Sequence, residues 1–548
     1  MIKNKINYIL NYNILEHLIC FYRNIPSLYK TTFWTTFIIL NIVFAYHTIS
    51  FFWGNHDWPF MVMPISWRTS WYEARFTETW LYLLMNFNFL PVLLNIFGFT
   101  GISLSAIGLA SYWKIPPKKT SYICFCLIFA LLPYNLCWLY HIAQTSYFYG
   151  CFILTSGLLL FERKRSSHIF FWWNTFVILI LFFVISTNAA FINVMCILVL
   201  GRSAIDFIQG KSLKNIIVDG LILLFDIACA ALLLKSAMLW ADHYNILYKE
   251  YYNIQHISLS EVPGKFLTVM KYSWQQFYII YPFLPRYLLN VLLMMTAVSL
   301  ITVFCCMIKR GGFCVGGLIF TFMLVALLFA TQLAIFISTN ETKLQFLFRI
   351  AGYFGLYYFF MLMLTFLFNF WNKEWLKNIL FLVAVSIMFM SAYNDMYAMR
   401  VWKLGRDAEE KIMQRVFSRF ESIDSFSYDK EYKVVVVGDI SMRKNYYNQY
   451  YDFLDVTTLG WSFRAFWSYL SYLNLNAPGV FVTQQIKPKD LLYMLSIKDL
   501  EDLYNNAEAW PHKNSVLIKN DIIFLFLQAY ELSEFKQMIR EFLNLQNK

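Results

Sequence analysis

The 548-residue chain is 59% hydrophobic and 20% aromatic, and only 14% of its residues are charged. This composition excludes a wholly soluble protein and predicts a polytopic membrane protein. The net charge of +12 comes from residues 1–399, because residues 400–548 hold 19 basic and 19 acidic side chains. Such a balance favours positive cytoplasmic loops over a nucleic-acid-binding surface.

The N-terminal residues 1–30 are amphipathic and basic, and we expect them to lie on the cytoplasmic membrane surface. The apolar run 33–53 that follows is long enough to span a bilayer. No small-x-small cleavage pattern follows this run, so we expect no cleavable signal peptide.

The loop after the first span, residues 54–90, collects charged and aromatic side chains close to the predicted membrane surface. Its candidate functional residues are His56, Asp57, Arg68, Glu73, Arg75 and Glu78. Charge next to hydrocarbon is costly, so such residues indicate function by default, although anchoring at the lipid headgroups is the ordinary alternative. Residues 79–90 are predicted to form a short outer half-helix, followed by a span from about Pro91 to Trp113.

Counting further apolar runs in chain order predicts about eleven transmembrane helices. The remaining spans are expected near 120–140, 143–161, 168–187, 188–201, 215–241, 281–308, 313–337, 350–371 and 377–396. This order places the basic clusters at 118–119, 162–165, 202–214, 309–310 and 373–377 on one side, which the positive-inside rule makes cytoplasmic. The loops 54–90, 242–275 and 338–349 and the segment after about Tyr397 are therefore expected outside.

The final segment, residues 398–548, has a different character, with more charge and no cysteine. Residues 432–438 are predicted to form a buried β-strand ending in a turn, with helices at 406–420, 491–504 and 521–545. A small α/β domain outside the membrane is the natural interpretation. The Val437-Gly438-Asp439 turn lacks the further glycines of a dinucleotide-binding motif, so we interpret it as structural.

Neither metal nor disulfide chemistry is predicted. All ten cysteines lie in or beside apolar runs and lack the spacing of metal ligands. Asp219, Asp226 and Lys235 fall inside a predicted span, where an ion pair between neighbouring helices is the simplest account.

A carboxylate at the outer membrane surface can act as a general base toward a sugar hydroxyl, and nearby cations can hold a phosphate. Asp57 is the first candidate base, with Glu73 and Glu78 next, while His56 is more typical of a cap or interface residue. The candidate phosphate-binding cations on the same predicted side are Arg68, Arg75, Lys271, Arg286, Lys343 and Arg349. Contact of Lys343 and Arg349 with lipid headgroups is the ordinary alternative.

The loop opening Asn55-His56-Asp57-Trp58 and closing Ala74-Arg75-Phe76 resembles the Gtr-type serotype-converting glucosyltransferases of O-antigen modification clusters. Further similarity lies in residues 186–191, Arg349 and the 433–438 strand. The family's usual pattern has glycine before the loop arginine, and this chain has Ala74, which leaves the donor pocket open to question.

This resemblance implies a GT-C-type fold in a bacterial inner membrane, with a cytoplasmic N-terminus, a transmembrane domain at 31–397 and a periplasmic C-terminal domain. It implies metal-independent, inverting sugar transfer from a polyprenyl-phosphate-sugar donor to a lipid-linked glycan, without a cofactor. Asp57 then matches the family's loop acid and Arg75 its loop arginine.

Other classes share this architecture. A flippase or transporter of lipid-linked glycans is expected to place polar residues near mid-span. A glycan polymerase is expected to carry several arginines in a large outer loop, and an aminoarabinose or phosphoethanolamine transferase is a further alternative, although the last lacks a metal-binding cluster here.

Overall fold

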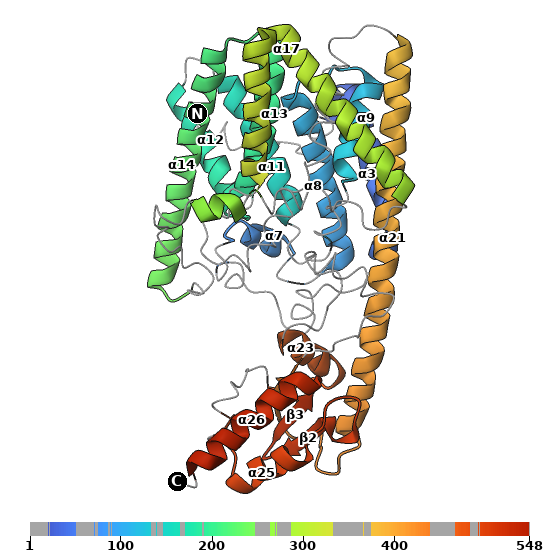
Figure 1. Ribbon diagram of the computed structural model, residues 1–548, viewed down its shortest axis with the longest axis vertical. Helices are drawn as coiled ribbons and strands as arrows, with labels where there is room; N and C mark the ends of the chain where they lie inside the picture. Colours follow the sequence, from blue (N-terminus) through green and yellow to red (C-terminus); the bar gives the residue numbers. More distant parts are fainter. Residues whose placement is uncertain are drawn as a thin grey trace, which may run out of the picture.

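The computed structural model describes residues 20, 22–50, 71, 75–85, 88, 90–132, 139, 146–164, 170–188, 191–246, 263–268, 270, 286–331, 365, 374–438, 466–482, 491–492 and 494–546. Long helices form one body, and a smaller α/β domain lies beyond one end of it (Figure 1). The helices of the body are α3 (Ser27–Val43), α4 (Ala45–Ile49), α7 (Glu78–Leu84), α8 (Pro91–Tyr112), α9 (Lys119–Ala130), α11 (Ser146–Lys164), α12 (Phe170–Ile185), α13 (Phe191–Ile208), α14 (Leu213–His243), α17 (Arg286–Thr331) and the first part of α21 (Glu374–Glu421).

Within the described residues, five helices are long and apolar enough to cross a membrane. They are Pro91–Tyr112, Phe191–Ile208, Leu213–His243, Arg286–Ala330 and Asn378–Leu404. Shorter apolar helices occupy Lys119–Ala130, Phe152–Glu162 and Trp172–Ile185. A helical membrane protein is therefore confirmed as the broad class, while the number of spans remains a prediction.

The helix α17 is two antiparallel segments rather than one rod. Gly312 has a φ of 73° and breaks the helical backbone. The rings of Phe304 and Phe320 lie 5.1 Å apart, which is possible only if the chain folds back between them, because sixteen helical residues would extend about 24 Å. A break next to Lys309-Arg310 agrees with the sequence prediction.

Two sequence predictions of helix bounds are wrong. The segment expected at 188–201 is α13, which begins at Phe191 and continues through Arg202 to Ile208. The apolar part of α21 extends to Leu404 rather than ending near residue 396, and the helix continues without interruption to Glu421. Both helices continue through charged residues, which a helix tolerates when other groups pair with the charge, as Glu162 and Asp206 pair with Arg202.

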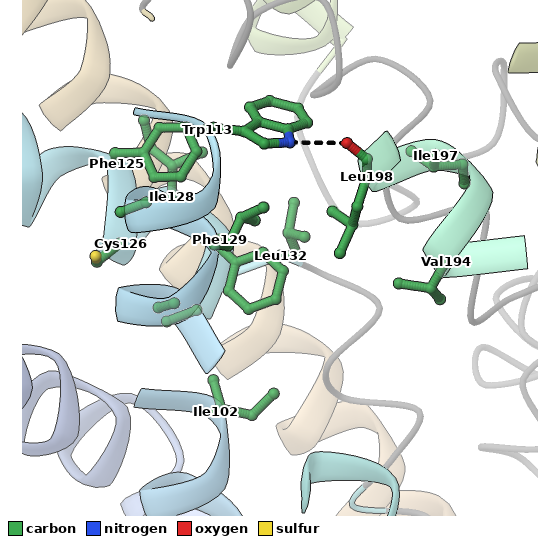
Figure 2. Close-up of a cluster of buried hydrophobic side chains, with 14 of the residues drawn as sticks. Ile102, Trp113, Phe125, Cys126, Ile128, Phe129, Leu132, Val194, Ile197 and Leu198 are labelled. Atoms are coloured by element: carbon green, nitrogen blue, oxygen red, sulfur yellow. Dashed lines mark hydrogen bonds between the residues drawn. The ribbon is translucent and has the colours of Figure 1, made fainter. Parts of the chain in front are cut away.

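The core of the helical body joins α8, α9 and α13. Trp113 lies between α9 and α13, where its indole nitrogen donates to the carbonyl oxygen of Leu198 at 3.0 Å (Figure 2). Phe125 and Phe129 of α9 pack around the same cluster. An added Cβ on Gly201 would lie 2.1 Å from the Trp113 ring, so only glycine at this position leaves room for the indole against α13.

The C-terminal domain contains a three-stranded sheet in the order β1-β3-β2. Its elements are β1 (Lys433–Val437), α23 (Phe466–Asn476), α25 (Ile497–Asn506), β2 (Val516–Lys519), β3 (Ile522–Phe526) and α26 (Ala529–Gln546). β1 pairs in parallel with β3, and β2 pairs with β3 as a hairpin. The predicted strand at 432–438 is confirmed, and Gly438 turns the chain after it with a φ of 83°.

The predicted helix at 521–545 is wrong in its first part. Asn520 and Asp521 have φ values of 48° and 58° and form the two-residue turn that joins β2 to β3. The helix α26 begins only at Ala529. The apolar run of β3 is buried at every position, and such a run does not distinguish a strand from a helix by periodicity.

Both faces of the sheet are covered, and α21 connects the domain to the helical body. One face packs against the end of α21 and α23, and the other packs against α25 and α26. Ala398 and Trp402 of α21 belong to the core of the helical body, whereas Val416 and Phe420 belong to that of the domain. The Arg419 guanidinium lies 4.3 Å from the Trp510 ring centroid and donates to the Pro511 carbonyl oxygen at 2.6 Å.

Replacing Gly201 with alanine is expected to force the Trp113 indole out of its site, at a cost of about 1–3 kcal/mol for overpacking. The measurement is the thermal unfolding midpoint of the purified protein in detergent. Gly317→Ala is the matched control, because an added Cβ there meets nothing within 4 Å. Equal midpoints for the two variants would contradict the close packing at Gly201.

Acid is expected to weaken the C-terminal domain through Asp499. Hydrogen bonds from Ser496 and Asn520 hold the pKa of this carboxyl below its ordinary value. Because the pKa of Asp499 is lower in the folded state, its ionised carboxylate stabilises the fold at pH values above its ordinary pKa of about 3.9. This stabilisation is lost as the pH falls through the lower pKa of the folded state. Unfolding of native protein and Asp499→Asn, followed between about pH 6 and pH 3, should show the smaller loss of stability in the variant.

Candidate functional site

Most of the residues predicted for the outer site, His56, Asp57, Arg68, Glu73, Lys343 and Arg349, lie outside the described residues. Arg75, Glu78 and Arg286 are described. Arg286 is exposed at the first residue of α17, and no described contact joins it to Arg75. The site described at this end of the body therefore centres on Arg75 and Glu78.

The partly buried Arg75 and the buried Glu78 form an ion pair at the start of α7. Arg75 Nη1 lies 3.7 Å from Glu78 Oε1, and the two side chains are 14% and 2% exposed. The Tyr82 hydroxyl, one turn further along α7, lies 3.5 Å from the other carboxylate oxygen. The carboxylate thus holds the guanidinium in place while burial keeps water from screening the pair.

Two contacts attach this turn to α12. The Thr77 hydroxyl donates to the carbonyl oxygen of Phe183 at 2.8 Å and lies 2.6 Å from the Ser186 hydroxyl. Nearby, Trp71 donates to the Thr79 hydroxyl at 3.0 Å and contacts the Trp240 ring. The end of the charged loop and the Ser186-Thr187-Asn188 segment, separated by more than 100 residues, therefore meet in the fold.

A second polar group lies inside the helices near the start of α8. The Asn95 amide nitrogen lies 3.3 Å from His47 Nδ1 and donates to the Thr48 hydroxyl at 3.2 Å. The His47 ring is fully buried and stacks on Trp402 of α21, with centroids 5.2 Å apart. Asp395, two turns before Trp402 on α21, is also fully buried.

Sequence reasoning missed this second group. His47 and Asn95 stand alone in apolar runs, and Asp395 falls next to the end assigned to the last span. A polar residue within an apolar run was the available signal, because such residues inside membranes are costly and mark functional or pairing sites.

The strongest cluster of charges lies at the opposite end of the body, where α8, α11 and α13 end and α14 begins (Figure 1). Arg202 is its centre, with a side chain only 8% exposed. Its guanidinium contacts Glu162 at 2.5 Å and Asp206 at 3.0 Å, and it donates to the carbonyl oxygen of Tyr112.

Two lysines complete this cluster. Lys114 and Lys211 each lie 2.8 Å from an Asp206 oxygen, and Lys211 also lies 2.6 Å from Asp219. Asp219 is paired with Lys211 in the turn before α14 rather than, as the sequence predicted, with a group on a neighbouring helix. The described contacts thus join three cations and three carboxylates from four helical segments, at the end of the body that the positive-inside rule makes cytoplasmic.

A cavity of about 240 Å³ adjoins the charge cluster. Its charged lining consists of Glu162, Arg202, Asp206, Lys211 and Asp219. The described residues contain no group of three or more His, Cys, Asp or Glu side chains arranged to hold a metal ion.

No family model, curated protein or solved structure matches this chain. The resemblance to the Gtr-type glucosyltransferases therefore depends on the quoted residues alone.

Arg202→Gln is expected to destabilise the helical body by about 3–5 kcal/mol, because it leaves Glu162 and Asp206 in a poorly hydrated site without their central cation. Lys114→Gln is the matched control, with an expected cost below about 1 kcal/mol, since its side chain is 42% exposed and Asp206 keeps two cations. Thermal unfolding in detergent compares the two. Similar midpoints would show that Arg202 is not central to the cluster.

Proposed function

We propose that this protein is a membrane glycosyltransferase that moves a sugar, with glucose as the first candidate, from a polyprenyl-phosphate donor to a lipid-linked surface glycan. The observation that supports it best is the partly buried Arg75–Glu78 pair at the end of the charged loop. An arginine fixed in a poorly hydrated site is suited to bind a lipid phosphate, which is both the donor's anchor and the leaving group.

The arrangement of the whole chain is consistent with this proposal. The turn that carries Arg75, the start of α8 and the α/β domain all lie toward one end of the helical body (Figure 1). The basic cluster around Arg202 lies at the other end. With the basic end cytoplasmic, the loop and the domain face the periplasm of a bacterial inner membrane, where a lipid-linked glycan acceptor can reach both.

In the proposed reaction Asp57 removes the proton from the acceptor hydroxyl as the sugar carbon is attacked. The donor's carbon–oxygen bond breaks and the electron pair leaves with the polyprenyl phosphate, whose charge Arg75 stabilises, with Arg68, Arg286, Lys343 and Arg349 as further candidates. The reaction inverts the sugar carbon and requires neither metal nor cofactor. His56 and Glu73 remain alternative catalytic groups of the same loop.

Glu78 is assigned a positioning role for Arg75, because its carboxylate is buried and already contacts the guanidinium and the Tyr82 hydroxyl. A buried carboxylate engaged in this way is a poor candidate for the base that sequence reasoning considered.

A flippase or transporter of lipid-linked glycans is the second candidate. The observation that favours it is the full burial of Asp395 and Asp226 within long apolar helices. Intramembrane carboxylates are typical of transport pathways.

The deciding assay incubates purified protein in detergent with synthetic undecaprenyl-phosphate-glucose and a lipid-linked glycan, with and without a chelator. Chelator-resistant product is expected from native protein, and Asp57→Asn should reduce kcat by a factor of about 10²–10⁴ while donor affinity is retained. Arg540→Gln, on α26, is the control for protein integrity. If the native protein transfers no sugar from a panel of lipid-linked donors but is active in a liposome flipping assay, the protein is a transporter rather than a transferase.

Glu78→Gln should raise the KM for the donor more than it lowers kcat, because it loosens Arg75 without touching the reacting atoms. Arg75→Gln should reduce kcat/KM further, and the double variant should add little to that loss. Additive effects of the two changes, or loss of kcat alone in Glu78→Gln, would contradict the positioning role.

A further inference from the structure

The cavity beside Arg202 has features of a binding site that the proposed sugar transfer does not use. It lies among the ends of α8, α11 and α13 and the first turns of α14, at the far end of the body from the α/β domain (Figure 1). Its volume of about 240 Å³ is below the range of pockets for drug-sized ligands, so a small group fits it.

The charges that line the cavity favour a ligand that carries both a positive and a negative group. Glu162, Asp206 and Asp219 contribute carboxylates, and Arg202 and Lys211 contribute cations. A guest with a single charge would attract one set and repel the other at short range. A zwitterion can place each of its charges against the opposite set.

Two of these side chains are exposed enough to give up a present ion-pair contact and bind a ligand instead. Glu162 and Lys211 are 31% and 30% exposed, whereas Arg202 and Asp206 are 8% and 5% exposed. The more exposed groups can bind ligand while the buried Arg202 keeps its contacts with Asp206 and with the Tyr112 carbonyl oxygen, the second of which joins α13 to α8. Lys211 supplies N–H donors for a phosphate, and the Glu162 carboxylate accepts hydrogen bonds from an ammonium group.

The expected ammonium group carries N–H bonds. A quaternary ammonium has none and is usually recognised by open aromatic faces. The described lining has two aromatic residues: the Arg202 guanidinium already lies over the Tyr112 ring at 5.4 Å, and Phe161 is packed into the hydrophobic core and only 7% exposed. The carboxylates therefore favour a primary amine.

The surface of α14 next to the cavity is apolar and uncovered by described residues. Ile217, Leu221 and Leu224 are 53%, 60% and 62% exposed, and helical geometry places them on the side of α14 that is bordered by the cavity residue Gly220. An added Cβ on Gly220 would meet nothing within 4 Å. A charged cavity that opens beside an exposed apolar helix in a membrane protein matches a lipid with a polar headgroup better than a free solute.

We propose that this cavity binds the headgroup of an amine-bearing zwitterionic phospholipid, with its phosphate at Lys211, its ammonium at Glu162 and its acyl chains along α14. The lipid joins the end of α11 to the start of α14 and so stabilises this end of the body. The proposal is independent of the sugar-transfer reaction.

The test titrates the delipidated full chain in detergent with dioleoyl phosphatidylethanolamine, phosphatidylcholine or phosphatidylglycerol and follows the thermal unfolding midpoint. Ligands that bind only the folded state raise this midpoint, and the stabilisation grows with the logarithm of the ratio of ligand concentration to dissociation constant. Phosphatidylethanolamine is expected to bind at least about tenfold more tightly than the other two, a difference of about 1.4 kcal/mol. Equal apparent affinities for the three lipids would overturn the proposal.

Two substitutions at Gly220 test whether the lipid binds in this cavity. Gly220→Leu adds bulk beside the cavity while keeping every charge, so it should abolish the preference for phosphatidylethanolamine, whereas Gly220→Ala should keep it. An unchanged preference in Gly220→Leu would place the lipid elsewhere. If that variant does not fold, the comparison of three lipids on native protein still decides between specific and general lipid binding.

Binding of water-soluble glycerophosphoethanolamine distinguishes a site for a lipid from a site for a free molecule with the same phosphate and amine. The soluble compound is expected to bind at least about a hundredfold more weakly than the lipid, because it lacks the acyl chains that cover α14. Equal binding of the two compounds would overturn the lipid assignment.

Discussion

The burial of Arg202 is the constraint on which the helical body depends. A guanidinium cannot leave water without partners that replace its hydration, and this one is 8% exposed. Glu162, Asp206 and the Tyr112 carbonyl oxygen supply those partners from three helices. The ends of α8, α11 and α13 are therefore held in one arrangement, and Lys211 extends it to α14 through Asp219.

Gly201, the residue before Arg202 on α13, makes this arrangement possible. The absence of a side chain there lets the Trp113 indole pack against α13 and donate to Leu198 (Figure 2). Close packing of helices through small residues is the usual means of association where lipid gives no hydrophobic driving force between them. Apolar packing and the ion cluster thus support each other at the same end of the body.

At the opposite end, the described charges include the Arg75–Glu78 pair, which is tied to a specific position. The Arg75–Glu78 pair is attached to α12 through Thr77 and Ser186, and α21 continues from the core of the body into the α/β domain. A 48-residue helix extends about 70 Å, and its last turns form part of the domain core. This continuous helix therefore gives the body and the α/β domain a direct connection.

The sequence by itself determined the class of the protein, most helix positions and the β1 strand, because long apolar runs and short valine-rich runs follow from local hydrophobicity. It also indicated that Asp219 would be paired. It did not locate the end of α13 or the β2–β3 hairpin, since charge within a helix and a fully buried strand are ambiguous in a local pattern. Only the tertiary structure decided that Arg202 is buried, that Glu78 holds Arg75, and that His47, Asn95 and Trp402 meet. These contacts join residues far apart in the chain, and the packing of helices, rather than any local preference, brings them together.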